Sequence, residues 1–184
     1  MQSQDLAALL RSRRTLNTFR PEAPPPAVIH QALDLARWVP NHHLTEPWRF
    51  YWLGRETARA IAELNADLIA AQTGRASAQE KLANWLAKPG WLVVTQVRSD
   101  DRLQHQEDYA ACCCAIHSIM LYLWSHGIGS KWSTGPVIRD PRFYELIWVD
   151  PDSEEVVGLV WYGYPAETPQ TPRKPLNELL IDLP

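Results

Sequence analysis

The longest apolar stretch of the chain runs from Tyr109 to Trp124, where only His117 and Ser118 interrupt small, aliphatic and aromatic residues. This pattern leaves no polar face for water to cover, so it predicts a helix that is buried on all sides. At roughly sixteen residues the helix is shorter than the twenty or so that span a bilayer, which favours a core helix. The next segment, 127–135, is rich in glycine and hydroxyl residues and predicts a turn into a strand whose backbone can lie close to a flat ligand.

Shorter patterns predict the remaining elements. Extended apolar runs favour strands, and the continuous apolar character of the run 156–163 indicates a sheet covered on both faces. Apolar residues at helical spacing predict further helices, and Asp140-Pro141 is typical of a helix start. The predicted strands are 48–53, 91–97 and 156–163, and the predicted helices are 4–13, the run from Pro24-Pro25-Pro26 to near Trp38, 56–72, 78–87 and one that begins at Asp140, with a polar loop over 99–104 before the central helix.

The chain has 184 residues, which is enough for one domain with a substantial core. No linker, internal repeat or low-complexity tract divides it, so residues 1–184 are predicted to form a single domain. The tail from Pro165 is rich in proline up to Leu176 and ends in a short apolar run. Such an extended tail does not fit within a small core, and we hypothesise an arm that reaches a second subunit.

The balance of charge argues against two classes of partner. The formal net charge is -3 with the two signs interspersed, which disfavours nucleic acid or an anionic membrane surface. The first five residues show no basic flank followed by an apolar region, so we expect no signal peptide and a cytoplasmic location. The three cysteines are adjacent and cannot form a disulfide framework, which fits a reducing compartment.

Several familiar catalytic patterns are missing from the sequence. Side chains of successive helical residues point about 100° apart, so Cys112, Cys113 and Cys114 cannot converge on one ion, and no zinc-type spacing occurs; we expect no metal site. There is no Gly-x-Ser-x-Gly turn for a nucleophile, and thiols within an apolar helix should have raised pKa values and little reactivity. The glycine-rich loops of classical nucleotide-binding folds are also missing.

Four short motifs remain, and they stand in a fixed order along the chain. They are Arg13-Arg14-Thr15, then Pro40-Asn41-His42 with Pro47-Trp48-Arg49-Phe50, then Trp132-Ser133-Thr134-Gly135, and finally Arg173-Lys174-Pro175-Leu176. In this order and spacing, with a long buried helix before the third, they resemble the nitroreductase family of flavoproteins over nearly the whole chain. The compact length is similar to that of the small YdjA-like subgroup.

The resemblance implies a set of FMN-binding residues. Arg13, Arg14 and Thr15 match the Arg-Arg-Ser segment that holds the FMN phosphate and ribityl chain, with Thr in place of Ser, and Arg173 would complete the phosphate site. Guanidinium groups suit this role because they bind phosphate through two parallel hydrogen bonds. The other implied cofactor-binding residues are Asn17, Trp38 where the subgroup often carries Arg, His42 after Asn41 in place of Asp, and Trp132, Ser133, Thr134 and Gly135 along the isoalloxazine ring.

The same residues are also compatible with plainer roles. Arginines at a helix end complement the helix dipole, His42 suits a solvated loop, and Arg173 suits a surface charge. The adjacent cysteines are small enough to permit close packing of the central helix.

The resemblance also implies a fold and a reaction. The fold is α+β, with a mixed β-sheet flanked by helices, in a homodimer that exchanges its C-terminal arm and holds FMN at the subunit interface. The implied reaction is ping-pong: NAD(P)H delivers hydride to the flavin, and a small electron acceptor such as a nitroaromatic or quinone then takes the electrons. No catalytic side chain is expected, because the cofactor carries the chemistry.

Two alternatives stay open at this point. One is another FMN reaction on the same scaffold, namely dehydrogenation, dehalogenation or flavin cleavage. The other is a non-enzymatic interaction protein whose arginines bind a partner.

Overall fold

The computed structural model describes residues 3–184 and contains a four-stranded sheet of order β1-β2-β4-β3. Each neighbouring pair of these strands is antiparallel. A parallel bridge joins Thr15 to Ser130 on β3, and it supplies the parallel part of the predicted mixed sheet. The strands are β1 (Trp48–Trp52), β2 (Gly90–Val97), β3 (Gly129–Ser133) and β4 (Glu154–Gly163).

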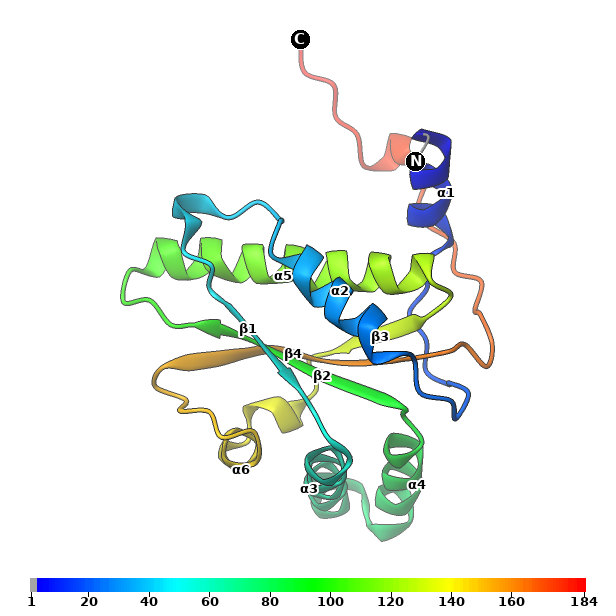
Figure 1. Cartoon of the computed structure of the whole chain (residues 1–184), viewed down its shortest axis with the longest axis vertical. Coiled ribbons are helices and arrows are strands. Elements are labelled where there is room, and N and C mark those ends of the chain that lie inside the picture. The colour runs from blue at the N-terminus through cyan, green and yellow to red at the C-terminus, as the bar shows by residue number, and fades with distance from the viewer. Residues whose placement is uncertain (1–2) are drawn as a thin grey trace.

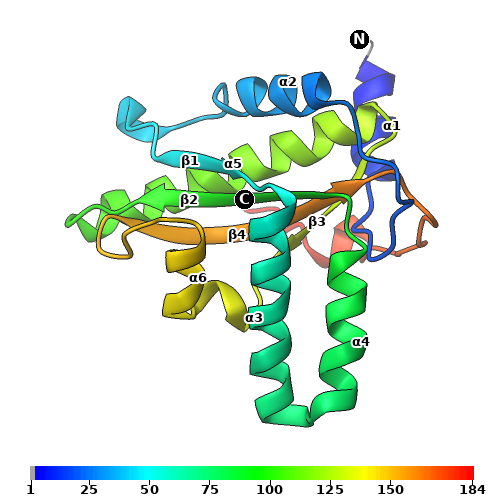
Figure 2. The ribbon, with the colours of Figure 1, turned by 60° about the horizontal axis from the view of Figure 1, so that its bottom comes forward.

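Helices cover both faces of the sheet, as the apolar strand patterns predicted. Figure 2 shows α2 and α5 over one face and α3, α4 and α6 over the other. Neighbouring residues of β2 take part in different cores: Leu92 packs in the cluster that includes Ile116 of α5, whereas Val93 packs in the cluster that includes Ile61 of α3. The helices are α1 (Ser3–Ser12), α2 (Pro26–Ala36), α3 (Arg55–Thr73), α4 (Arg75–Leu86), α5 (Arg102–Ser125) and α6 (Pro141–Leu146), with short 3-10 helices η1 (His42–Leu44), η2 (Pro136–Arg139) and η3 (Leu176–Glu178).

The central helix α5 begins earlier than predicted. The carboxylate of Asp101 accepts hydrogen bonds from the backbone N–H groups of Leu103 (2.8 Å) and Gln104 (2.9 Å), so helix forms inside the segment expected to be a polar loop. The helix ends as predicted, before Gly127, whose φ of 72° is easily reached only without a side chain. No helix within residues 3–184 is long and apolar enough to cross a membrane.

One face of α5 is exposed in the single chain, which corrects the prediction of a helix buried on all sides. The sheet and α2 cover two of its flanks, and Ala115 and Ile116 are fully buried there. No other part of residues 3–184 covers the remaining flank. Its exposed residues include Leu103, Tyr109, Ala110, Cys114 and His117.

The C-terminal tail leaves the body of the molecule near α1 (Figure 1). Its apolar side chains, among them Leu176, Ile181 and Leu183, are exposed in the single chain. The tail therefore has the extended form predicted from its prolines, while its exchange between subunits stays a prediction.

A contact between β4 and β3 shapes the edge of the sheet. A Cβ atom at Gly158 would lie only 2.0 Å from Nε1 of Trp132, so the indole occupies the space that a side chain would need. The same Nε1 donates a hydrogen bond to the backbone oxygen of Val157 at 3.3 Å. The position of Trp132 therefore depends on a glycine in the neighbouring strand.

We expect Gly158→Ala to destabilise the protein by about 1–3 kcal/mol, because the added methyl group forces the Trp132 indole away from the sheet. Denaturant unfolding of the single variants and of the double variant with Trp132→Leu measures this. Gly158→Ala should lower the free energy of unfolding much less in the Trp132→Leu background than in the unmodified protein. An equal decrease in both backgrounds would contradict the steric explanation.

Candidate functional site

The edge strand β3 divides the candidate site in two. Successive side chains of a strand point to opposite faces of the sheet. Accordingly, Trp132 and Thr134 line a hollow beside α5, whereas Lys131 and Ser133 line a hollow beside α3 and α4. The segment predicted from sequence to lie along a flat ligand thus contributes to two separate concavities.

The hollow beside α5, which we call the arginine hollow, has a volume of about 430 Å³. It brings together Arg13, Thr15, Trp132 and Thr134, which were predicted as one site from motifs far apart in the sequence. The bridge between Thr15 and Ser130 explains this, because it fixes the segment after α1 along β3. The lining residues are Arg13, Thr15, Tyr109, His117, Met120, Trp132 and Thr134.

Three guanidinium groups lie close together, and one of them, that of Arg13, lines this hollow. Nη1 of Arg13 and Nε of Arg14 are buried and have no hydrogen-bond partner within residues 3–184. Burial lowers the pKa of Arg13, and repulsion by Arg173 and then by Arg14 lowers that pKa further. Arg173 in the tail therefore interacts with Arg13, although 160 positions separate them in the sequence.

Such a group of like charges is unfavourable without an anion. Buried N–H groups normally have a partner, and buried guanidinium groups normally face a carboxylate or a phosphate. Nη1 of Arg14 donates to the backbone oxygens of Arg11 and Arg13, and Nη1 of Arg173 donates to that of Pro172. The other N–H groups of these two residues and the unpaired Nη1 of Arg13 offer donors of the kind that bind a phosphate group. The residues present therefore fit a phosphate-bearing ligand.

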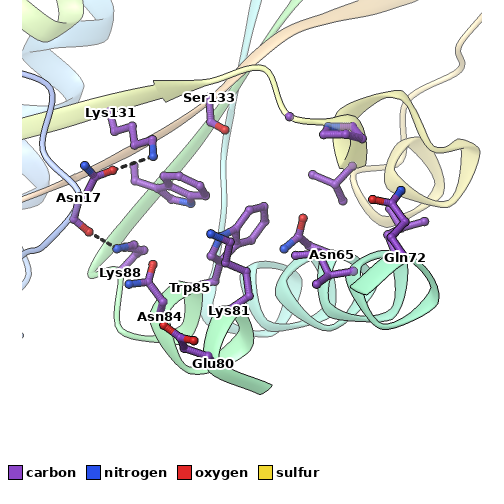
Figure 3. Close-up of a pocket in the computed structure, with 16 residues that line it drawn as sticks. Asn17, Asn65, Gln72, Glu80, Lys81, Asn84, Trp85, Lys88, Lys131 and Ser133 are labelled. Carbon is purple, nitrogen blue, oxygen red and sulfur yellow. Dashed lines mark hydrogen bonds between the residues drawn. The ribbon is translucent and has the colours of Figure 1, made fainter. Parts of the chain in front are cut away.

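The second hollow, which we call the lysine hollow, has a volume of about 460 Å³ and lies between β3, β4 and the α3–α4 hairpin (Figure 3). The side chain of Asn17, another predicted site residue, accepts a hydrogen bond from Nζ of Lys131 at 2.7 Å. The backbone oxygen of Asn17 accepts one from Nζ of Lys88. The lining residues are Asn17, Asn65, Leu68, Ile69, Gln72, Glu80, Lys81, Asn84, Trp85, Lys88, Lys131, Ser133, Gly135, Pro136, Val137 and Trp161.

Sequence reasoning missed most of the lysine hollow. The sequence predicted only a helix over 78–87, with no role for Lys81 or for Lys88 just after it, and no motif marks Asn65 on α3. The one available signal was Lys88 directly before Pro89 and a buried strand, a position where a charged side chain is unlikely to stay in water. Its exposure of 8% bears this out.

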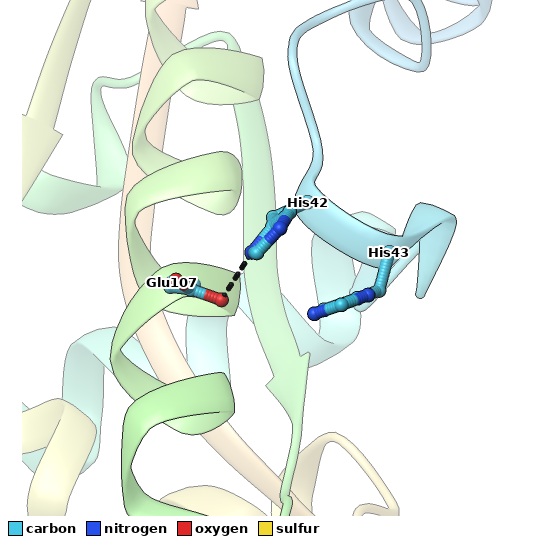
Figure 4. Close-up of side chains that lie close together, drawn as sticks. All are labelled: His42, His43 and Glu107. Atoms are coloured by element: carbon cyan, nitrogen blue, oxygen red, sulfur yellow. Dashed lines mark hydrogen bonds and ion pairs between the residues drawn. The ribbon is translucent and has the colours of Figure 1, made fainter.

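Two predicted site residues lie away from both hollows within one chain. Nδ1 of His42 lies 2.7 Å from Oε2 of Glu107 on α5 (Figure 4). Glu107 and Tyr109 are two positions apart, so their side chains leave the helix in roughly opposite directions. His42 therefore contacts the flank of α5 opposite the arginine hollow. Trp38, just beyond α2, is 80% exposed.

The loop that carries His42 is held by side chains without a predicted role. The buried Asp108 accepts a hydrogen bond from the hydroxyl of Thr45. Oδ1 of Asn41 accepts one from the backbone N–H of Glu46 at 2.7 Å, and its Nδ2 donates to Thr45 at 3.0 Å. Asn41, predicted only as a replacement for Asp, thus fixes the loop that presents His42.

The loop also forms a cluster that spacing rules did not reveal. One ligand atom from each of His42, His43 and Glu107 lies within 4.8 Å of the others, so the cluster has the composition of a metal site. The rings of the two histidines are stacked at 3.9 Å between centroids. The hydrogen-bond contact between Nδ1 of His42 and Oε2 of Glu107 and the stacking of the two histidine rings describe this arrangement, and we assign no metal to it.

Two cysteines of α5, Cys112 and Cys113, fit the predicted packing role, whereas Cys114 is exposed on the uncovered flank of the helix. Burial, with smaller contributions from Cys113 and Asp108, raises the pKa of Cys112 to about 12. Burial also raises the pKa of Cys113. A thiol with so high a pKa carries little thiolate at neutral pH and is a poor nucleophile, as predicted.

Comparison with known proteins shows the family to which the chain belongs. The model of the nitroreductase family matches residues 10–164. One relative is YfhC of Bacillus subtilis, whose name assigns it provisionally to the NAD(P)H nitroreductases. It is 30% identical over 183 residues, which cover 97% of this chain and 94% of YfhC. YdjA of Escherichia coli K12, provisionally named in the same way, is 23% identical over 164 residues, covering 88% of each chain.

Solved structures share the fold over the full length. A nitroreductase-like family protein from Bacillus cereus superposes with a TM-score of 0.85 at 27% identity, covering 100% of this chain and 98% of its own. The FMN-dependent nitroreductase NfnB from Mycobacterium smegmatis, in complex with NADPH, has a TM-score of 0.79 at 15% identity, with 99% of each chain covered. The chain belongs to the nitroreductase family, as the four motifs indicated.

We expect inorganic phosphate to raise the melting temperature of the ligand-free protein, because it neutralises the clustered guanidinium groups. At a concentration one hundred times the dissociation constant, binding adds about 2.7 kcal/mol of stability. Thermal unfolding with increasing phosphate, at constant ionic strength, measures this.

Arg13→Gln should remove most of the rise in melting temperature that phosphate causes. Arg59→Gln, a control that removes an exposed charge on α3, should retain that rise. An Arg13→Gln variant that responds to phosphate like the unmodified protein would contradict an anion site at these arginines.

Proposed function

We propose that the protein is an FMN-dependent oxidoreductase that uses NAD(P)H to reduce electron-poor acceptors such as nitroaromatics or quinones. The observation that carries this proposal is the set of unpaired, buried guanidinium N–H atoms of Arg13 and Arg14 beside Arg173. It provides a phosphate site at the end of a hollow of the size that small ligands occupy. The FMN and NADPH named for NfnB support the same assignment in this family.

The residues of the arginine hollow have distinct tasks in this proposal. Arg13, Arg14 and Arg173 hold the FMN phosphate, and the hydroxyl of Thr15 lies beside them for the ribityl chain. Trp132 and Thr134 provide the surface for the ring system. Gly158 fixes the indole of Trp132 in place, so that surface is rigid before the ligand arrives.

When bound, FMN supplies the redox chemistry, because it takes two electrons as a hydride from NAD(P)H and passes two electrons to the acceptor. The protein therefore needs no acid or base of its own. Its contribution is to orient the ring and to place positive charge and N–H donors where negative charge develops on the reduced flavin. The backbone N–H groups from Ser133 to Gly135 and the ammonium group of Lys131 are the groups we assign to this task.

We also propose a homodimer in which the exposed flank of α5 packs against the second subunit. Leu103, Ala110 and Cys114 form an apolar stripe at helical spacing, and such a stripe is rarely left in water. A second chain would bring its own His42 and Trp38, which the single chain places away from the arginine hollow. The apolar C-terminal tail fits an arm across the same partner, and the cytoplasmic location stays a prediction.

The direct test is the colour and spectrum of the purified protein. We expect a yellow protein with a flavin spectrum that NADH or NADPH bleaches without oxygen, and that a nitroaromatic or quinone restores. Arg173→Gln should lower FMN affinity about tenfold or more, since it removes one charge-assisted contact with phosphate.

A colourless protein that neither binds added FMN nor oxidises NAD(P)H would refute the proposal and favour a non-enzymatic interaction protein. Products from a panel of acceptors would separate nitro or quinone reduction from dehalogenation, dehydrogenation or flavin cleavage.

Ala110→Arg should convert the dimer to a monomer, because it places a charge on the apolar flank of α5. Size-exclusion chromatography with light scattering measures the mass, and the retained flavin should fall in parallel. Ala83→Arg, an equal change at an exposed position of α4, should leave both unchanged. A dimer that persists in Ala110→Arg with full flavin content would rule out this interface.

A further inference from the structure

We propose that Arg139 is a positioning residue for the flavin site. Its guanidinium group holds the peptide bond between Thr134 and Gly135 in the orientation in which the N–H of Gly135 points to the cofactor. This inference rests on the proposed function and deepens it. Arg139 lies outside all four motifs, and the property that it sets is the preference of the protein for reduced over oxidised FMN.

A single hydrogen bond fixes the direction of this peptide. Thr134 and Gly135 lie between the end of β3 and the start of η2, and Nη1 of Arg139 donates a hydrogen bond to the backbone oxygen of Thr134 at 2.9 Å. A planar trans peptide directs the C=O of one residue and the N–H of the next to opposite sides. The bond that holds the oxygen of Thr134 therefore also sets the direction of the N–H of Gly135.

The two ends of this peptide belong to different hollows. Arg139 lines a third hollow of about 540 Å³ between α5, η2 and α6, and Thr134 lines it too. Gly135 lines the lysine hollow, together with Ser133 and Lys131, which the proposed function assigns to the flavin (Figure 3). Because Arg139 draws the carbonyl oxygen toward the third hollow, we place the N–H of Gly135 on the side of the flavin.

The N–H of Gly135 is available to a ligand. It donates no hydrogen bond within residues 3–184, whereas the backbone oxygen of Gly135 accepts one from the N–H of Ile138 at 3.3 Å. The next residue, Pro136, has no N–H to offer. Gly135 therefore carries the last free backbone donor before η2.

The charge of Arg139 strengthens this donor. In the described part of the chain Arg139 forms no ion pair, and its side chain makes no hydrogen bond other than that to Thr134. A charged donor polarises the peptide group that it binds, and hydrogen bonds in series strengthen one another. The N–H of Gly135 therefore favours a partner that gains negative charge, as the flavin does on reduction.

The midpoint potential of bound FMN tests the inference, because it reports the ratio of the affinities for reduced and oxidised FMN. Arg139→Met should lower this ratio about tenfold, which for a two-electron couple is a shift of about 30 mV to a more negative potential. Arg139→Lys keeps a charged donor and should restore most of the ratio. Because Arg139 is exposed, water can replace its bond to Thr134, so the melting temperatures of the flavin-free variants should change little.

Arg98→Met separates the contact with the peptide from a plain effect of charge. Arg98 lines the same third hollow, but its guanidinium group donates to the backbone oxygen of Pro151 at 2.7 Å and to Glu155 at 3.3 Å. Its removal changes the net charge by the same amount and leaves the peptide of Thr134 untouched. The potential should therefore move much less in Arg98→Met than in Arg139→Met.

Gly135→Pro tests whether Arg139 acts through the N–H of Gly135. The φ of −61° at Gly135 is one that proline adopts, so the substitution removes the N–H and keeps the path of the main chain. Gly135→Pro should lower the potential by itself, and Arg139→Met should add little to that shift in the double variant. Where Gly135→Pro retains too little FMN for the measurement, the comparison of Arg139→Met with Arg139→Lys and Arg98→Met decides.

Three results would overturn the inference while leaving the proposed function intact. They are an unchanged potential in Arg139→Met, equal shifts in Arg139→Met and Arg98→Met, and shifts of Arg139→Met and Gly135→Pro that simply add. The first would make Arg139 an ordinary surface residue, the second would reduce its effect to charge alone, and the third would exclude the N–H of Gly135 as the link. A protein that binds no FMN would instead refute the proposed function, and the positioning role with it.

Discussion

The packing of helices on both faces of the sheet is the constraint on which the site depends. β2 and β4 are buried on both sides, with α2 and α5 above and the α3–α4 hairpin below, so they offer little surface to a ligand, and β4 contributes only Trp161 to the lysine hollow. β3 lies at the edge of the sheet and is only half covered beyond Ser130. Both hollows are found along this edge, where polar side chains avoid the free-energy cost of being buried away from water.

The alternation of side chains along β3 gives the two hollows different chemistry. On one face the strand meets Arg13, which lies close to Arg14 and Arg173, and on the other it meets three ammonium groups. The net charge of the whole chain is nevertheless -3. Composition argued against an extended basic surface for nucleic acid, but it could not reveal positive charge concentrated in two small concavities.

The sequence predicted most of the fold, four residues of the arginine hollow and three of the lysine hollow, namely Asn17, Ser133 and Gly135. Strong patterns, such as the apolar runs of β2, β4 and α5, placed their elements because burial dictates residue type there. Arg13, Thr15, Trp132 and Thr134 were grouped through motifs, and the fold does bring them together.

The remaining features depend on tertiary contacts that no local pattern encodes. The start of α5 was missed because one cap residue, Asp101, overrides the polar character of the segment that follows. Lys81 and Asn65 carried no signal, since a lysine or an asparagine on an amphipathic helix usually faces water. The exposed flank of α5 was read as buried because apolar residues look alike whether their own chain or another one covers them.

The placement of His42 and the arginines on opposite flanks of α5 has a thermodynamic consequence for cofactor binding. His42 and the arginines lie on different sides of this helix, so a cofactor that touches both sets must be held by two chains at once. Cofactor binding and subunit association would then be linked equilibria, each strengthening the other by the same factor. The fraction of loaded protein would depend on total protein concentration as well as on free FMN. Dilution alone would release the cofactor, even with every residue of the site intact.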